Sequence, residues 1–363
     1  MNTLEALVLL NMVEGIGSVR LKKLMEFFKE APRVFEASAH ELTSSGILNS
    51  AMAKRVLDAP RRYSAKQEIQ NAAKQGVRIL TLFDEGYPNI LKEIYDPPFV
   101  LYTKGEFIAA DANAVGVVGS RGASPYGLSC AEIFSSKLSR YGLTVVSGLA
   151  RGIDTVSHRA ALNSNGRTIA VLGSGFNNIY PPENEGLFNE IAQKGVVVSQ
   201  FSLNTAPLAC NFPIRNRIIS GLSRGVLVVE ASFKSGALIT ARFALEQGRE
   251  VFAIPGKVTS DTSCGTNELI KQGAKMVTKP EEILEDLQFN FTFINDQPGQ
   301  KPEGSLNAKE LSVAELLSDE PQYIDHISEQ SGLSASDIMS ILAQLELKGF
   351  AKQLPGKNFI KAS

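Results

Sequence analysis

The side chains best suited to chemistry are arginines in glycine-containing turns that follow apolar, β-branched segments. Gly119-Ser120-Arg121-Gly122 follows Ala114–Val118, and the segment Ser147–Asp154 follows Leu143–Val146. Glycine lets a backbone approach a ligand closely, and the free N–H groups at the start of the next helix point at that ligand. Arginine keeps its charge and holds phosphate through two parallel hydrogen bonds. Repeated units of this kind predict a site for a run of phosphates.

A third predicted turn, Phe212–Arg217, adds an aromatic ring to two further arginines. Single strands of nucleic acid bind in basic grooves whose aromatic side chains stack on the bases. Phe212 either serves in this way or packs in the core, and Asn216 either fixes the turn or faces a base. Ser235-Gly236 opens another predicted helix after Val228–Ala231. The predicted phosphate- and DNA-binding residues are therefore Gly119, Ser120, Arg121, Ser147, Gly148, Arg151, Gly152, Phe212, Arg215, Asn216, Arg217, Ser235 and Gly236.

The elements that must position these residues alternate between short strands and helices. This alternation predicts the α/β class, with a Rossmann-like parallel sheet and helices on both faces. Ligands bind such sheets at the carboxyl ends of the strands, where the turns lie. Strands are expected at Val77–Leu82, Ala114–Val118, Thr144–Ser147, Thr168–Leu172, Val196–Ser199, Val226–Val229, Glu250–Ala253 and Lys275–Val277. Helices are expected at Ser64–Gln75, Tyr126–Tyr141, Thr155–Asn163, Glu185–Gln193, Ile214–Leu222, Gly236–Gln247 and Gly265–Gln272.

Residues 1–65 are expected to form a helical domain of the SAM or helix-hairpin-helix type. Apolar residues recur at helical spacing in Leu4–Met12 and Val19–Phe28. The segment Glu14–Ser18 between them has the core pattern of a helix-hairpin-helix turn. That turn either offers backbone N–H groups to a DNA phosphate or is only a compact connection between helices. Basic residues follow it at Arg20, Lys22 and Lys23.

The remaining boundaries predict a Rossmann-like domain at 66–288, a Pro- and Gly-rich linker at 289–307 and a winged-helix domain at 308–363. Helices at Leu311–Leu317, Ile324–Ser331 and Ser334–Leu347 precede wing strands at Phe350–Leu354 and Asn358–Lys361. The third of these helices carries Asp337 and Glu346 and no basic residue. A DNA-reading helix normally presents basic or amide groups. We therefore expect a protein-interaction module or a weak DNA contact through the wing.

Composition limits the classes of function. The chain has 363 residues and a net charge of −1, so any DNA affinity must come from a local basic surface. Its three cysteines show no CxxC spacing, which fits a reducing cytosol and a cytoplasmic protein. Its three histidines, His40, His158 and His326, lack metal-ligand spacing. We expect no metal, no cofactor, no signal peptide and no membrane span.

The motifs together resemble the DprA/Smf family of DNA-processing proteins. The resemblance runs from about Pro97 to Pro280. It rests on GSR, SGLARGID, AVLGSG, YPPEN, FPIRNRIISGLS, VVEASFKSGALITA and PGKVTSDTSCGTNELIKQGA, in that order. Membership implies a dimer that binds single-stranded DNA without sequence preference, protects incoming DNA and loads the RecA recombinase in natural transformation. Family members often carry a basic residue shortly before the Phe of FPIRN, but Pro207–Asn211 has none. If that contact matters, this protein must supply it from another residue, for example Lys234 or Lys257.

Two enzymatic alternatives arise from acidic residues near the turns. Asp154 and His158 are four residues apart, so both can face the same side of a helix. They form either a catalytic pair or a structural one, and no Ser or Cys nucleophile is evident beside them. Asp154 alternatively orients Arg151 or caps the next helix. The Ser235-Gly236 turn also resembles that of nucleoside-monophosphate hydrolases, in which a glutamate acts on the sugar. Glu230 and Glu246 are possible counterparts, but the hydrolase Pro-Gly-Gly turn is missing.

We therefore expect Glu230 to be structural, as a partner of an arginine. We also expect a non-enzymatic DNA-binding protein rather than a hydrolase. A winged-helix transcription factor is disfavoured because the third helix of residues 308–363 is acidic.

Overall fold

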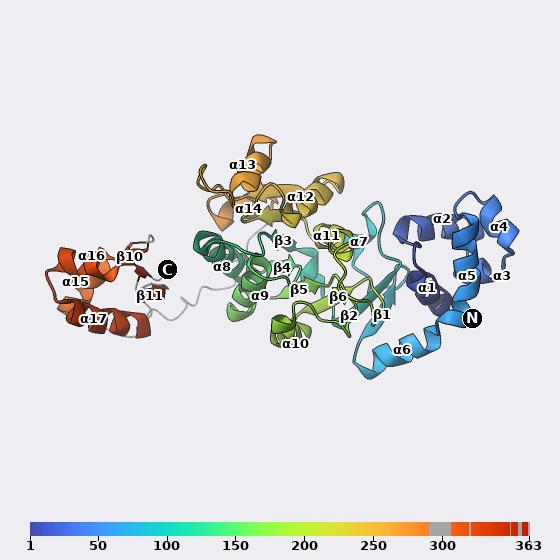
Figure 1. Ribbon diagram of the computed structural model, residues 1–363, viewed down its shortest axis with the longest axis horizontal. Coiled ribbons are helices and arrows are strands. Elements are labelled where there is room, and N and C mark those ends of the chain that lie inside the picture. Colours follow the sequence, from blue (N-terminus) through green and yellow to red (C-terminus); the bar gives the residue numbers. More distant parts are fainter. Residues whose placement is uncertain (290–305, 319–320, 349, 355–357, 362–363) are drawn as a thin grey trace. The chain divides into compact units, whose positions relative to one another are not determined.

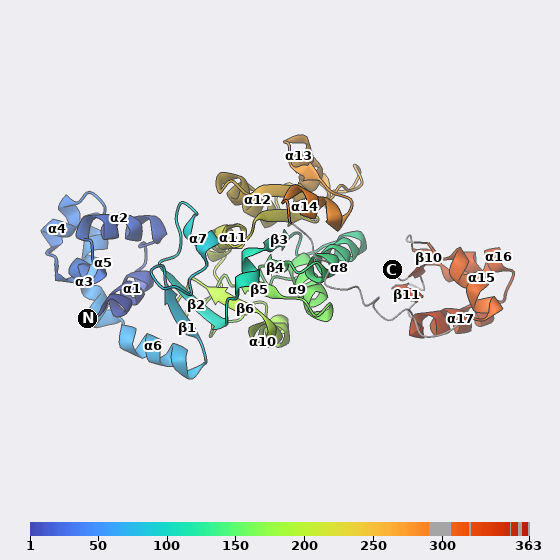
Figure 2. The same ribbon diagram turned by 180° about the vertical axis from the view of Figure 1, so that it is seen from behind.

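The computed structural model describes residues 1–289, 306–318, 321–348, 350–354 and 358–361. The chain folds as two compact units, Met1–Ile294 and Asn295–Ser363. Figures 1 and 2 show both, coloured along the sequence. Most of the predicted linker, at 290–305, lies outside the described residues.

The first unit begins with short helices, and polar side chains cap the first, fourth, fifth and sixth of them. Asn2 and Ser38 each accept a hydrogen bond from the backbone N–H of a glutamate three residues later, and that glutamate bonds back to the cap. Asn49 and Ser64 cap the two helices that follow. The helices are α1 (Thr3–Met12), α2 (Ser18–Phe28), α3 (Ala31–Glu36), α4 (Ala39–Ser44), α5 (Ser50–Arg62) and α6 (Ala65–Lys74).

These helices share a hydrophobic core with the sheet that follows. Leu7 and Val56 belong to the same buried cluster as Val100, Leu172 and Phe188. The α1–α6 region is therefore packed on the sheet through apolar side chains, and Figure 1 shows it in blue beside β1 and β2.

The sheet has nine strands in the order β1-β2-β6-β5-β4-β3-β7-β8-β9. Neighbours from β6 to β9 in this order run parallel, whereas β2 is antiparallel to both β1 and β6. The expected Rossmann-like fold is confirmed, but the sheet is mixed. The strands are β1 (Arg78–Thr81), β2 (Val100–Gly105), β3 (Ala114–Val118), β4 (Thr144–Ser147), β5 (Thr168–Val171), β6 (Val196–Ser199), β7 (Gly225–Val228), β8 (Glu250–Ala253) and β9 (Lys275–Met276).

Strand β2 was not predicted from the sequence. It is joined to β1 through a connection that holds only the one-turn helix α7 (Asn89–Lys92). The two strands pair antiparallel, with Arg78 opposite Thr103 and Thr81 opposite Val100.

Helices cover both faces of the sheet. Ile218 of α11 and Ala241 of α12 pack on one face, whereas Phe134 of α8 and Ala161 of α9 pack on the other. Figure 1 shows α11 and α12 across the strands from α9 and α10. The helices are α8 (Pro125–Arg140), α9 (Ile153–Asn163), α10 (Glu185–Lys194), α11 (Asn211–Gly221), α12 (Gly236–Glu246), α13 (Cys264–Lys271) and α14 (Pro280–Asp286), with 3-10 turns at Ala109–Ala112 and Pro182–Asn184.

The second unit has the winged-helix elements that were predicted. Ser334 caps its third helix by accepting a hydrogen bond from the N–H of Asp337. Val313, Ile327, Leu342 and Phe359 lie in its own buried core. The elements are α15 (Ala308–Leu316), α16 (Ile324–Ser331) and α17 (Ala335–Leu347), with a sheet ordered β10 (Gln322–Tyr323), β12 (Asn358–Lys361), β11 (Ala351–Leu354). Across the described residues of both units, no helix is long and apolar enough to cross a membrane.

Candidate functional site

The two glycine turns meet at the carboxyl edge of the sheet, as expected. They follow β3 and β4, which are neighbouring parallel strands. The backbone N–H of Ile153 donates to the carbonyl of Ser120 at 3.3 Å, so the turns are locked together. Gly152 has a φ of +73°, and a Cβ there would lie 2.3 Å from the same Ser120 oxygen. Only glycine fits this position.

An exposed cluster of arginines and aromatic rings lies on these turns. The guanidinium carbon of Arg121 is 4.9 Å from the ring centroid of Phe212. The Phe212 ring in turn is 5.9 Å from that of Tyr180, and Arg151 lies 5.8 Å from the Tyr180 ring. Arg121 and Arg151 are exposed, and Phe212 is half-buried. We call Arg121, Arg151, Tyr180 and Phe212 the exposed cluster.

The segment Phe212–Arg217 is not a turn, contrary to the sequence prediction. It lies in α11, which begins at Asn211. Pro213 falls in the first turn of that helix, where its missing N–H costs no intrahelical hydrogen bond. The helix brings Phe212 to the exposed cluster and directs Arg215 and Arg217 into the protein, where they are 3% and 5% exposed.

Arg215 is bonded to the backbone beneath the turns. Its guanidinium donates to the carbonyls of Gly148 and Val171, and its Nε donates to Oδ1 of Asn216 at 3.1 Å. A Cβ on Gly148 would lie 2.5 Å from Nη1 of Arg215. Gly148 is therefore needed for the packing of this arginine.

Asp154 compensates part of the buried charge of Arg215. Its carboxylate accepts hydrogen bonds from the N–H groups of Gly148 (3.1 Å) and Ala150 (3.3 Å), so it holds the turn and does not orient Arg151. Burial raises the pKa of Asp154. Burial also lowers the pKa of Arg215 to about 10, against the attraction of Asp154, so Arg215 remains charged at neutral pH.

His158 makes no catalytic pair with Asp154. Its Nδ1 bonds to Oγ1 of Thr168 at 2.6 Å, and the ring is fully buried. Burial, with a smaller contribution from Arg215, lowers its pKa to about 3. We call Arg215, Asp154 and His158 the buried cluster, because the charge of Arg215 acts on both of the others.

The other predicted site residues do not join the exposed cluster. Arg217 forms an ion pair with Asp96 at 3.4 Å and donates to Oγ of Ser18 at 3.1 Å. Asn216 donates to the carbonyl of Gly236 at 3.2 Å. Ser235 caps α12 by accepting from the N–H of Ala237. These contacts assign framework roles, and direct DNA contacts by these residues remain predictions.

Arg151 already has a partner of opposite charge. It forms an exposed bidentate ion pair with Glu183, whose pKa that pairing lowers. Arg121 differs from Arg151 in its surroundings, because its guanidinium lies over the ring of Phe212 and not against a carboxylate.

Sequence reasoning overlooked two residues of the YPPEN motif. Tyr180 supplies the second ring of the exposed cluster. Asn184 is buried and donates to the carbonyl of Leu149 at 2.9 Å, which supports the turn after β4. In the sequence, only their position in the YPPEN motif shared with the DprA/Smf family could have pointed to them.

Glu230 is structural, but its expected arginine partner was wrong. Its carboxylate accepts from the N–H and Oγ of Ser124 (2.8 and 2.7 Å) and from Oγ1 of Thr262 (2.6 Å). It is 2% exposed. It thus ties the end of β7 to the start of α8. Within the described residues, no group of His, Cys, Asp and Glu side chains converges as a metal site.

Comparison with known proteins shows which family has these features. The family model described as DNA recombination-mediator protein A matches residues 78–288. The model of the DprA winged helix domain matches residues 297–357. The chain belongs to the DprA/Smf family. Protein Smf of Escherichia coli (strain K12) is 43% identical over 318 residues, which cover 85% of this chain and 84% of that protein. DNA processing protein DprA of Bacillus subtilis (strain 168) is 45% identical over 215 residues, which cover 59% of this chain and 72% of that one.

Solved DprA structures share the fold. The X-ray structure of DprA from Streptococcus pneumoniae has a TM-score of 0.68 and 35% identity, covering 80% of this chain and all (100%) of that one. DNA processing protein A from Helicobacter pylori, solved for its single-stranded DNA binding mode, has a TM-score of 0.54 and 29% identity. That match covers 60% of this chain and 97% of that one.

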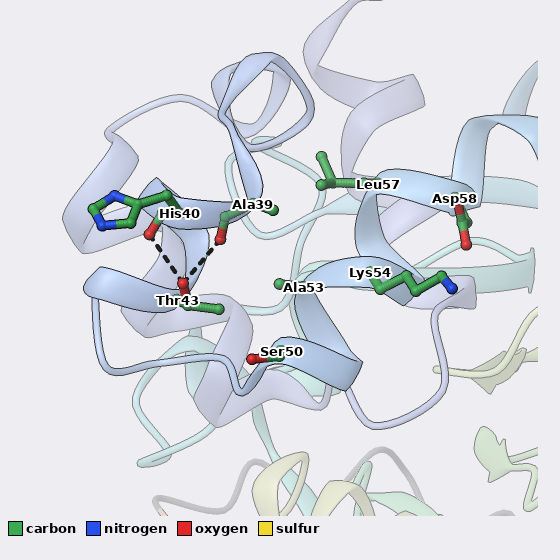
Figure 3. Close-up of a pocket in the computed structure, with 8 residues that line it drawn as sticks. All are labelled: Ala39, His40, Thr43, Ser50, Ala53, Lys54, Leu57 and Asp58. Atoms are coloured by element: carbon green, nitrogen blue, oxygen red, sulfur yellow. Dashed lines mark hydrogen bonds between the residues drawn. The ribbon is translucent and has the colours of Figure 1, made fainter.

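The exposed and buried clusters both fall within residues 78–288, the part matched to DNA recombination-mediator protein A. A separate hollow of about 410 Å³ lies outside it, between α4 and α5. Figure 3 shows that the Thr43 hydroxyl there is bonded to the carbonyls of Ala39 and His40, at 2.9 and 3.0 Å. This hollow holds none of the predicted site residues of the DprA/Smf chain, and we assign it no function.

Proposed function

We propose that this DprA/Smf chain binds single-stranded DNA without sequence preference on the exposed cluster. The observation that supports the proposal is the position of Arg121, whose guanidinium carbon is 4.9 Å from the centroid of the half-buried Phe212 ring. The centroid of the Tyr180 ring is 5.9 Å from that of Phe212. Every base can stack on an aromatic ring, and guanidinium groups can bind the phosphates that join successive nucleotides.

The backbone around Arg121 adds a second kind of support. The turn Gly119–Gly122 follows β3 directly and is tied to the end of β7 by the N–H of Ser120, which donates to the carbonyl of Glu230 at 2.8 Å. A turn fixed at this edge holds Arg121 where a phosphate would contact it, at little further cost in entropy.

Further parts of the proposal rest on the family. We propose that the protein acts as a dimer, protects incoming DNA and hands it to RecA during transformation. We assign it no catalytic step. The hydrolase alternative has no support in the site, because Glu230 is buried and engaged by Ser124 and Thr262.

A binding titration tests the proposal. Labelled single-stranded and duplex oligonucleotides of several sequences are titrated with protein, and fluorescence anisotropy is followed at several salt concentrations. We expect tighter binding of single strands, little difference between sequences and a steep loss of affinity with salt, because phosphate contacts release counterions. Equal affinity for duplex, or an affinity independent of salt, would contradict the proposal.

A further inference from the structure

Among the exposed aromatic side chains of the first unit that lie outside the exposed cluster, Tyr95 has a cation over its ring. Tyr95 lies between α7 and β2. It is 74% exposed, more than any other tyrosine or phenylalanine among the residues that the structure describes. The ammonium of Lys22 lies 5.6 Å from the centroid of its ring. The pair thus presents a ring face and a cation together.

The segment that carries Tyr95 is held firmly from beneath. Asp96, its neighbour, forms the ion pair with the buried Arg217, which also donates to the Asp96 carbonyl. The same guanidinium donates to Ser18 at the start of α2 and to Oε1 of Gln200 (2.5 Å) just after β6. One buried arginine therefore fixes Tyr95, the start of α2 and the carboxyl edge of the sheet relative to one another.

Helix α2 adds cations near Tyr95. Arg20, Lys22 and Lys23 are all exposed on this helix, and Lys22 is the one that lies over the Tyr95 ring. The neighbouring carboxylate of Asp96 is already paired with Arg217, so it does not cancel these charges. We call Arg20, Lys22, Lys23 and Tyr95 the Tyr95 patch.

Helix α11 links the exposed cluster to the framework that holds Tyr95. It carries Phe212 in its first turn, and the buried Arg217 further along contacts Asp96, next to Tyr95, and Ser18 at the start of α2. A flexible polymer with alternating flat bases and negative charges matches a ring bordered by cations. The cation beside the ring and the shared helix thus favour the same strand as the occupant of both surfaces.

We propose that the Tyr95 patch is a second stacking contact for single-stranded DNA, which a strand held at the exposed cluster reaches when it is long enough. The proposal rests on the proposed function. It gives the α1–α2 region a role that does not need the Glu14–Ser18 turn.

Fluorescence gives a direct test, because the chain has 0 tryptophans. Tyr95→Trp introduces a single reporter that a stacked base quenches. The probes are dT oligonucleotides of about 6 and about 30 nucleotides. Single-strand sites typically cover about 4–16 nucleotides, so the first is near the lower end of that range and the second is longer than it. We expect strong quenching by the longer oligonucleotide and little by the shorter. Tyr63→Trp, at the exposed end of α5, is the control and should not respond.

Affinity gives a second measurement. Tyr95→Ala should weaken binding of the longer oligonucleotide about tenfold, the size expected for one lost base–aromatic stack, and leave binding of the shorter one unchanged. Lys22→Glu should also weaken binding of the longer oligonucleotide alone, because it places a negative charge beside the ring. Lys54→Glu makes the same charge change on α5 and should leave both unchanged. Because Tyr95 and Lys22 are exposed, these variants should unfold at the same urea concentration as the parent.

The outcomes separate this inference from the proposed function. A parent protein that binds neither oligonucleotide overturns both. Normal binding of the longer oligonucleotide by Tyr95→Ala, with no quenching of the tryptophan in Tyr95→Trp at saturation, overturns the inference alone. A Tyr95→Trp fluorescence that changes with protein concentration in the absence of DNA would instead assign the patch to contact with a second copy of the chain, and would also overturn it.

Discussion

The exposed and buried clusters use the same residue type in opposite ways. Arg121 and Arg151 are exposed and lie over aromatic rings, whereas Arg215 is buried and bonded to the carbonyls of Gly148 and Val171. Arg121 has charge available to a ligand, whereas the charge of Arg151 is already paired with Glu183. The buried one directs its hydrogen bonds to the backbone that shapes the turns. Neighbouring arginines in family motifs therefore need not bind DNA together, and loss of binding in a variant has two distinguishable causes.

Arg215→Ala should give the largest effect, and that effect should be on stability. It leaves the carboxylate of Asp154 buried without its compensating charge and frees the Gly148 and Val171 carbonyls. Removing one partner of a buried charge pair costs about 3–5 kcal/mol. Urea unfolding followed by circular dichroism measures it, with Arg215→Lys as a variant that keeps the charge. Unfolding of Arg215→Ala at the parent's urea concentration would remove Arg215 from the framework.

His158 tests the buried cluster through pH. Its pKa is about 3 in the folded protein, below its ordinary value of 6.5. Below pH 6.5 the unfolded chain binds a proton that the folded chain takes up only near pH 3, so acidification lowers the free energy of unfolding. The loss is about 1.4 kcal/mol per pH unit, or about 2 kcal/mol at pH 5. His158→Asn should abolish this loss.

The measurement compares urea unfolding of parent and His158→Asn at pH 7 and pH 5. Asp154, whose pKa is raised, acts with the opposite sign, but it is present in both proteins and cancels in the comparison. Equal pH dependence of the two proteins would show that His158 titrates normally.

Arg121→Ala tests the exposed cluster. We expect affinity for single-stranded DNA to fall by about 1–3 kcal/mol, the value of a hydrogen bond to a charged group, with unchanged urea unfolding. Arg151→Ala should cost less, because Glu183 already neutralises that arginine. Arg242→Ala on α12 removes a highly exposed cation elsewhere and serves as control. Anisotropy titration at one fixed salt concentration measures all three.

A different order of effects would change the comparison. If Arg151→Ala weakened binding more than Arg121→Ala, the Glu183 pair would have to open for DNA, and the Tyr180 side would become the main contact. Full binding by Arg121→Ala would remove the exposed cluster as the site.

The smallest effect should come from removing residues 305–363. The second unit has its own core, and its third helix carries Asp337 and Glu346 on a segment without basic residues. We expect the shortened chain to fold and to keep its affinity for single-stranded DNA within about twofold, or about 0.4 kcal/mol. A folded protein that has lost most of its affinity would make the winged-helix unit a primary DNA site.

Part of the fold could be predicted because local signals are strong. The strands β3, β4 and β6 lie where the β-branched segments placed them, and the carboxyl edge carries the glycine turns. The misses have local reasons as well. The helix expected at Ile214–Leu222 begins at Asn211 instead, since Pro213 fits its first turn, and β2 at Val100–Gly105 was not expected.

The sequence by itself determined the α/β alternation, the glycine turns and the family, because these depend on spacing along the chain. Only the tertiary structure decided which arginines are exposed. Arg215 lies on the same helix as Phe212 with its guanidinium carbon 5.9 Å from that ring, yet it is buried. Arg217, further along the helix, is directed to Asp96 and Ser18. The pairing of Arg151 with Glu183 and of Tyr95 with Lys22 likewise joins segments far apart in sequence. Such contacts depend on packing, which no local pattern encodes.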